Sequence, residues 1–123
     1  RLADLDRAAA RYDALIATTT RPVLLHGDLH LGNVLDGGAD RGLVAIDPKA
    51  CVGDPCFDAV DYVLDGAGLD GVSFRCARLA QASGWDPDRL DGWCRAIAPI
   101  VAISHLGRGS PPRVVAELLS LAS

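Results

Sequence analysis

The chain has 123 residues, half of them hydrophobic, which is enough for one domain with a buried core. Its formal net charge of -4 does not provide the broad basic face that nucleic-acid binding requires, and an acidic surface instead favours small cationic ligands. No apolar run is long enough to span a bilayer and no signal-peptide pattern is present, so we expect a cytoplasmic protein with neither nucleic acid nor membrane as a partner.

The cysteines form no C-x-x-C pair and no compact metal-binding spacing. They are Cys51, Cys56, Cys76 and Cys94. Because their neighbours are mostly apolar, we expect reduced thiols that pack as small hydrophobic side chains.

The N-terminal segment has the pattern of an amphipathic helix. Residues 2–16 place apolar side chains at steps of three and four, with charged residues mostly between them. The threonines at 18–20, which have poor helix propensity, and Pro22 end this helix, and the apolar residues 23–25 predict a short strand.

The next stretch, HGDLHLGNVL at residues 26–35, has the spacing of a kinase catalytic loop, H-x-D-x-x-x-x-N. In such a loop a carboxylate receives or orients the attacking hydroxyl, and a carboxamide oxygen holds a magnesium ion. Asp28 is therefore the candidate catalytic residue and Asn33 a candidate metal ligand. Alternatively, each could be an ordinary loop residue, Asp28 accepting from backbone donors and Asn33 forming a turn.

A hairpin should bring a second carboxylate to this loop. The run DGGADRG at residues 36–42 has turn composition and separates two β-type segments, residues 33–36 and 43–47. Folding back returns Asp47 to the neighbourhood of Asn33 and Asp28. Asp47 is the second candidate Mg²⁺ ligand, because this ion prefers oxygen ligands. A side-chain bond to the backbone at the strand end would explain Asp47 alone but not the joint spacing.

Two cationic or imidazole side chains could bind the phosphates of ATP. His30 lies within the loop, and Lys49 follows Asp47 by two residues. A structural role for His30 and for His26 is the stronger reading, since Asp28 already fills the role of the base. Lys49 is equally well explained as a solvated loop lysine.

These residues resemble the aminoglycoside phosphotransferase-like kinases, whose catalytic loop reads HGDxHxxN and whose metal-binding Asp opens an IDW or IDP motif. The run IDPKACVGDPCFDAVDYVL at 46–64 is most similar to the streptomycin 6-kinase and hydroxyurea phosphotransferase branch. The resemblance covers about residues 22–65. It implies transfer of the γ-phosphate of ATP, with Mg²⁺, to an alcohol group of a small molecule such as an aminoglycoside.

The resemblance also implies a fold class, α+β and mainly helical. The chain would be a single domain, the C-terminal lobe of a protein-kinase-like fold, with a small β-hairpin carrying the catalytic and metal residues. We expect the N-terminal nucleotide-binding lobe to be missing, because no Gly-rich phosphate loop and no strand lysine precede His26.

The remainder of the chain reads as a loop followed by helices. Residues 48–55, with two prolines and a glycine, predict a loop over the active cleft. Asp54 or Asp58 should cap the next helix or tie it to the catalytic loop. Helices are predicted at 57–65, 72–83, 86–106 and 113–121, with Pro99 kinking or breaking the third near Ala96. The acids at 61, 65, 86, 88 and 91 could line a site for a cationic acceptor or simply form solvated helix faces.

Two other functions remain open at this point. His26, Asp28 and His30 on one strand face could ligate zinc or iron in a metal-dependent hydrolase, although this leaves Asn33 and Asp47 unexplained. The chain could also be an inactive truncated kinase-like lobe without catalysis of its own.

Overall fold

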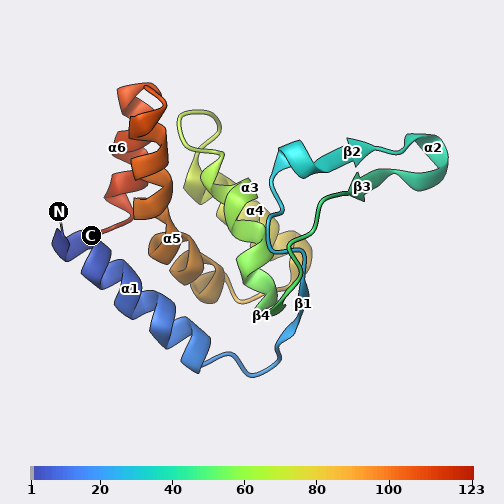
Figure 1. Cartoon of the computed structure of the whole chain (residues 1–123), viewed down its shortest axis with the longest axis horizontal. Helices are drawn as coiled ribbons and strands as arrows, with labels where there is room; N and C mark the ends of the chain where they lie inside the picture. Colours follow the sequence, from blue (N-terminus) through green and yellow to red (C-terminus); the bar gives the residue numbers. More distant parts are fainter. Residues whose placement is uncertain (1) are drawn as a thin grey trace.

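A computed structural model describes residues 2–123 (Figure 1). Its helices, 3-10 turns and strands follow in the order α1 (Leu2–Ala17), β1 (Val23–Leu25), η1 (Leu31–Asn33), β2 (Val34–Asp36), α2 (Gly38–Arg41), β3 (Leu43–Ala45), β4 (Cys51–Gly53), η2 (Pro55–Ala59), α3 (Val60–Leu64), α4 (Val72–Ser83), α5 (Pro87–Gly107) and α6 (Pro112–Ser120). The longer helices form one body, from which the β2–β3 hairpin projects. A mainly helical α+β fold with a small hairpin is thus confirmed. None of the helices in residues 2–123 combines the length and apolar composition needed to cross a membrane.

Helix α5 is the centre of the helical body, and α1, α3, α4 and α6 all pack against it. It begins as predicted, with Asp86 accepting a hydrogen bond from the Asp88 N–H at 2.9 Å and Pro87 in the first turn. The most deeply buried large side chains of the core are Leu64, Leu90, Leu118, Val63 and Cys94. Three of these come from α3 and α6, so the core forms where these helices meet α5.

Pro99 does not break α5. The helix continues to Gly107. Ala98 and Ala102, on either side of the proline, are both fully buried. The stabilisation from packing this face outweighs the loss of the one backbone hydrogen bond that proline cannot donate.

Helix α1 matches the predicted amphipathic helix and packs along α5. Two of its arginines reach the end of the chain: Arg7 Nε donates to the Ala122 carbonyl at 3.3 Å and Arg11 Nη2 to the Ser123 carbonyl at 3.1 Å. These contacts hold the first helix beside the last residues, as Figure 1 shows.

Two two-stranded antiparallel sheets accompany the helices. In the first, β1 pairs with β4 through Val23 with Gly53, Leu24 with Val52 and Leu25 with Cys51. The prediction of an irregular loop over residues 48–55 was therefore wrong for the middle of that segment. Its prolines lie outside β4, and the residues between them can pair with β1 without a missing ladder donor.

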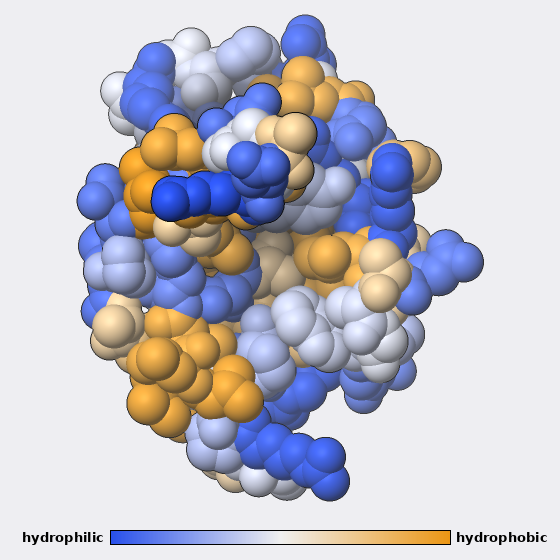
Figure 2. Space-filling model, turned by 90° about the vertical axis from the view of Figure 1, so that its right-hand side faces the viewer, coloured by the Kyte–Doolittle hydropathy of each residue, from blue (hydrophilic) through white to orange (hydrophobic). Residues whose placement is uncertain are grey.

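The second sheet is the predicted hairpin, in which β2 and β3 pair Val34 with Ala45 and Asp36 with Leu43. Its connection contains one helical turn, α2, and Gly42 returns the chain at a positive φ of 63°. Several hairpin side chains are apolar yet exposed, including Leu43 at 79%. Figure 2, which looks at the molecule from the hairpin side, shows apolar patches among the polar surface here.

The helices after the hairpin agree with the predictions in outline. The expected helix at 57–65 divides into the 3-10 turn η2 and the short α3. Helix α4 spans the predicted residues, and α6 begins one residue earlier than expected. Glu117 of α6 accepts from the Gly68 and Val72 N–H groups at 2.8 and 2.9 Å, which braces the start of α4.

Three of the cysteines pack as expected and one does not. Cys56, Cys76 and Cys94 are buried, whereas Cys51 is exposed at the edge of the β1–β4 sheet. Burial, reinforced by the nearby Asp54 charge, raises the pKa of the Cys56 thiol to about 12. The expectation of a hydrophobic setting was wrong for Cys51, because the outward side of a two-stranded sheet has no covering layer.

Candidate functional site

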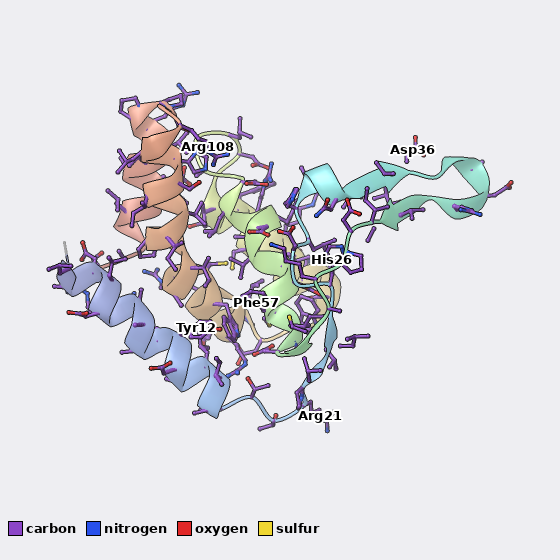
Figure 3. All side chains as sticks on the ribbon, viewed as in Figure 1. Tyr12, Arg21, His26, Asp36, Phe57 and Arg108 are labelled. Carbon is purple, nitrogen blue, oxygen red and sulfur yellow. The ribbon has the colours of Figure 1, made fainter. Side chains whose placement is uncertain are left out.

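The loop that follows β1 is held by hydrogen bonds from its own histidine. His26 lies where the hairpin meets the helical body (Figure 3). Its Nδ1 accepts from the Asp28 N–H at 3.1 Å, so Nε2 carries the proton and donates to the Ile46 carbonyl at 2.7 Å. Both ring nitrogens are occupied by backbone groups, and His26 therefore joins the start of the loop to the end of the hairpin.

Asp58 of η2 holds the same loop from the other side. Its two carboxylate oxygens accept from the N–H groups of His26 and Gly27 at 2.8 and 2.9 Å. Gly27 adopts a φ of 88°, and a Cβ there would lie 3.2 Å from Cys51 Sγ. The turn thus requires glycine. Of the two acids expected to cap η2 or tie it to the loop, Asp58 ties it and Asp54 caps it, accepting from the Cys56 N–H at 3.0 Å.

Three of the other candidate residues surround one oxygen of Asp28. Asn33 Nδ2 lies 3.3 Å from Asp28 Oδ2, and both His30 Nε2 and Lys49 Nζ lie 3.9 Å from it. The Asp28 side chain is 32% exposed, so the carboxylate is held but reachable from solvent. A partly exposed carboxylate beside cationic or imidazole groups can accept a proton from, or orient, a hydroxyl.

Asn33 is oriented by its amide nitrogen. Nδ2 donates to the Asp28 carbonyl at 2.9 Å as well as to its side chain. The residue is 8% exposed, and no buried side-chain oxygen or nitrogen within residues 2–123 lacks a partner. Oδ1, which has no hydrogen bond within residues 2–123, is therefore not completely enclosed. The carboxamide can offer this oxygen to a hard cation.

Asp47 follows β3 directly, and the hairpin brings its neighbour to Asn33. The Ile46 N–H donates to the Asn33 carbonyl at 2.9 Å, while the Lys49 N–H donates to the His26 carbonyl at 2.8 Å. Asp47 lies between these anchors with a φ of 53°, uncommon for a residue other than glycine. Its carboxylate makes no hydrogen bond or ion pair with Asn33 or Asp28 within residues 2–123.

His30 has a local structural role in addition to its position beside Asp28. Its Nδ1 accepts from the Gly32 N–H at 3.0 Å and so caps η1, which directs Nε2 toward the Asp28 carboxylate. The Lys49 side chain, by contrast, is 73% exposed.

Of the other acids, Asp61 interacts electrostatically with Asp28 of the loop. Burial raises its pKa, and the charges of Asp65 and Asp28 raise it further. Asp86 caps α5, and Asp91 pairs with Arg95 on the same helix at 2.7 Å. These two have structural roles, whereas Asp61 adds negative charge near Asp28.

The structure does not support a zinc or iron site at His26, Asp28 and His30. Residues 26–30 form no strand, and His26 has no free ring nitrogen. No three His, Cys, Asp or Glu side chains of residues 2–123 are grouped to hold a metal. A carboxamide and a carboxylate, as found at Asn33 and Asp47, are oxygen donors of the kind that Mg²⁺ prefers.

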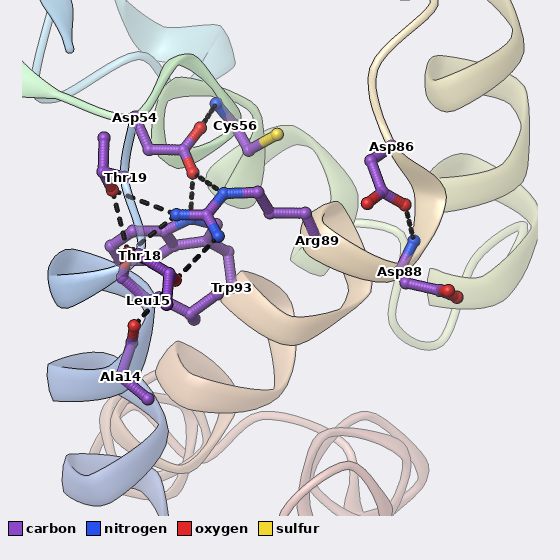
Figure 4. Close-up of polar contacts among 10 residues, drawn as sticks. All are labelled: Ala14, Leu15, Thr18, Thr19, Asp54, Cys56, Asp86, Asp88, Arg89 and Trp93. Atoms are coloured by element: carbon purple, nitrogen blue, oxygen red, sulfur yellow. Dashed lines mark hydrogen bonds and ion pairs between the residues drawn. The ribbon is translucent and has the colours of Figure 1, made fainter. Parts of the chain in front are cut away.

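The sequence did not point to Arg89 and Trp93, which bind Asp54 (Figure 4). The Asp54 carboxylate is 5% exposed and accepts from Trp93 Nε1 at 2.9 Å and from Arg89 Nε. Burial alone would raise its pKa, but the bonds from Trp93, Cys56 and Arg89 outweigh this and lower it. No local pattern marks these contacts, because the partners are far apart in the chain.

Comparison with known proteins gives two relatives and one family. Residues 2–109 match the family model described as aminoglycoside/hydroxyurea antibiotic resistance kinase. A hydroxyurea phosphotransferase from Kitasatospora aureofaciens is 39% identical over 98 residues, 76% of this chain and 28% of that protein. A streptomycin 3''-kinase from Klebsiella pneumoniae is 34% identical over 117 residues, 87% of this chain and 44% of that protein. The chain thus spans less than half the length of these relatives, and no solved structure matches it.

Proposed function

The chain belongs to the aminoglycoside/hydroxyurea antibiotic resistance kinase family, and from this premise we propose that it is the catalytic part of a small-molecule phosphotransferase. The reaction would transfer the γ-phosphate of ATP to an alcohol group of the acceptor. The arrangement around Asp28 carries the proposal, because one half-buried carboxylate meets Asn33, His30 and Lys49 within 4 Å.

In this proposal Asp28 accepts or orients the proton of the attacking hydroxyl, so that its oxygen approaches the γ-phosphorus in line. Asp58 and His26 hold the loop from opposite sides, which fixes where the Asp28 carboxylate can be. Lys49 and His30 would contact the transferred phosphoryl group.

Asn33 Oδ1 and the Asp47 carboxylate would hold Mg²⁺. The Oδ1 of Asn33, which is not completely enclosed, and the exposed, left-handed Asp47 support this assignment. When bound, the ion would neutralise negative charge on the phosphates of ATP.

The adenine and the remaining phosphates would bind to a nucleotide-binding lobe outside this sequence, making residues 1–123 the C-terminal lobe. The exposed apolar residues of the β2–β3 hairpin support this, since Leu35 and Leu43 have no covering layer within residues 2–123. A lobe packed on the hairpin would bury them.

We further propose a cationic aminoglycoside such as streptomycin as the acceptor, with resistance to the antibiotic as the outcome. The negative charge of the chain and the position of Asp61, which feels the charges of both Asp65 and Asp28, support a cationic acceptor. Hydroxyurea, named for one relative, is the neutral alternative. The second candidate function is an inactive kinase-like lobe. The lack of a Gly-rich phosphate loop and a strand lysine before His26 favours it for the isolated chain.

The test uses the full-length parent protein with ATP, Mg²⁺ and either streptomycin or hydroxyurea, and detects the phosphorylated acceptor by mass spectrometry. We expect Asp28→Asn to lower kcat by about 10² to 10⁴-fold with an unchanged circular dichroism spectrum. Asp40→Asn in α2, the same change at the hairpin tip, is the matched control and should retain wild-type turnover. Near-wild-type activity of Asp28→Asn would refute the assignment, and an inactive wild type would favour the inactive lobe.

A further inference from the structure

Arg89, at the start of α5, joins the end of α1 to Asp54, the residue before η2. Its Nε pairs with the buried Asp54 carboxylate. Its Nη2 donates to the Leu15 carbonyl at 2.7 Å and to Thr19 Oγ1 at 3.0 Å, and its Nη1 donates to Thr18 Oγ1 at 3.0 Å (Figure 4). One guanidinium thus binds the last turn of α1 and the residue that begins η2.

The Asp54 end of this link leads to the catalytic loop. Asp54 caps η2 through the Cys56 N–H, and η2 carries Asp58 within its single short run from Pro55 to Ala59. Asp58 then holds the N–H groups of His26 and Gly27. Asp54 also follows β4, the strand that pairs with β1 and so fixes where the loop begins.

We propose that Arg89 is a positioning residue of the proposed phosphotransferase, which sets the catalytic loop through Asp54 and Asp58 and couples it to the position of α1. The inference rests on the proposed function only for its effect on catalysis. A planar guanidinium is needed, because its forked N–H groups reach α1 and Asp54 together, which a lysine ammonium cannot do.

A cavity of about 360 Å³ lies beside this link, between α1, the β1–β4 sheet and α5. Ile16, Thr19 and Asp54 are among its lining residues. Part of the link therefore borders open space rather than packed core.

The first test measures amide hydrogen exchange by NMR in the 123-residue chain, which needs no activity. In Arg89→Met we expect the His26 and Gly27 amides to exchange at least about tenfold faster, relative to the core amides of Val63 and Leu118, because Asp58 loses its support. The matched control is Glu117→Gln, which weakens a similar carboxylate brace on the Gly68 and Val72 amides. In this control, the exchange rates of the His26 and Gly27 amides relative to the core amides should not change.

An equal acceleration at the loop and at Val63 and Leu118 would overturn the proposal, since Arg89 would then be only a stabilising residue. If Arg89→Met does not fold, Asp54→Asn weakens the same link. It must also accelerate exchange at the His26 and Gly27 amides more than at the core amides. In the full-length parent, either variant should lower kcat by about 10 to 100-fold with little change in KM for ATP, as expected when a catalytic group is misplaced. An unchanged kcat in these variants would refute the effect of Arg89 on catalysis. An inactive wild type would refute the proposed phosphotransferase function, and the hydrogen-exchange result alone would then test whether Arg89 holds the loop.

Discussion

Four aspartates near the loop differ because each carboxylate meets different neighbours. Asp58 accepts from two backbone N–H groups, one at each oxygen, and Asp54 is buried among Cys56, Trp93 and Arg89. Asp28 is only partly paired and stays reachable. Asp61 has a raised pKa, because burial and the charges of Asp65 and Asp28 disfavour its ionised form. The groups around each carboxylate therefore distinguish the structural acids, Asp54 and Asp58, from the candidate catalytic acid, Asp28.

The raised pKa of Asp61 predicts that its charge destabilises the native state at neutral pH. The folded state then binds more protons than the unfolded state, from the unfolded value near 3.9 up to the raised folded value, so stability falls as pH rises through this window. Asp61→Asn should raise the free energy of unfolding at pH 7 by less than about 1 kcal/mol, since water still reaches the half-buried group. Urea unfolding at pH 7 and pH 3 measures this. A gain of equal size at both pH values would contradict the electrostatic cause.

Thiol chemistry gives a second prediction at this scale. Burial raises the pKa of Cys56, Cys76 and Cys94, and only Cys51 is exposed. Iodoacetamide should therefore label one thiol per native chain, and Cys51→Ser should remove that labelling while urea restores reactivity at the other three. Peptide mapping identifies the labelled residue. Labelling of Cys94 in the native chain would contradict the burial of this thiol beside α5.

The β2–β3 hairpin positions two candidate ligands that are distant in sequence. Its antiparallel register places Ile46 against Asn33, and Asp47 follows at once in a left-handed conformation. A hairpin of this kind returns its second strand to the start of the first. The element therefore brings the IDP motif to the catalytic loop.

If Asn33 and Asp47 hold one Mg²⁺, their substitutions should not be additive. In the full-length parent, Asn33→Ala and Asp47→Ala should each raise the Mg²⁺ concentration needed for half-maximal activity, with Asp47→Ala the more severe because it removes a full charge. The double variant should lose clearly less than the sum of the single losses in activation free energy. Strict additivity with unchanged Mg²⁺ dependence would mean that the two residues do not share an ion.

At the scale of the whole molecule, a packed helical body carries two thinly covered sheets. The body is buried around α5, whereas Leu24, Val52 and Leu43 are more than two-thirds exposed on the strands. The candidate loop lies at the junction between the two regions. The best-packed part of the molecule thus supports the site, and the exposed strands lie where further protein would pack.

This division predicts weak nucleotide binding by the isolated chain. Residues 1–123 offer Asn33, Asp47, His30 and Lys49 but no phosphate-covering loop, so we expect a Kd for ATP-Mg²⁺ in the millimolar range or weaker, roughly -4 kcal/mol. Isothermal titration calorimetry measures it, with the full-length parent as the comparison. A micromolar Kd for the isolated chain would place the nucleotide site within these residues.

The local sequence determined most of the helices and the loop motif. The limits of α1, α4, α5 and α6 follow from apolar periodicity, proline and capping residues, all of which act within a few residues. The spacing of Asp28, Asn33 and Asp47, together with the turn at 36–42, was enough to predict that a hairpin would bring these segments together.

Only the tertiary structure decided the features whose partners are far apart in the chain. The pairing of β4 with β1, the exposure of Cys51 and the link from Arg89 to Asp54 and α1 depend on contacts across 26 to 74 residues. A sequence window contains no periodicity or capping pattern for such contacts. The Arg89 link forms because Asp54 is buried beside α5, and a buried carboxylate needs hydrogen-bond partners.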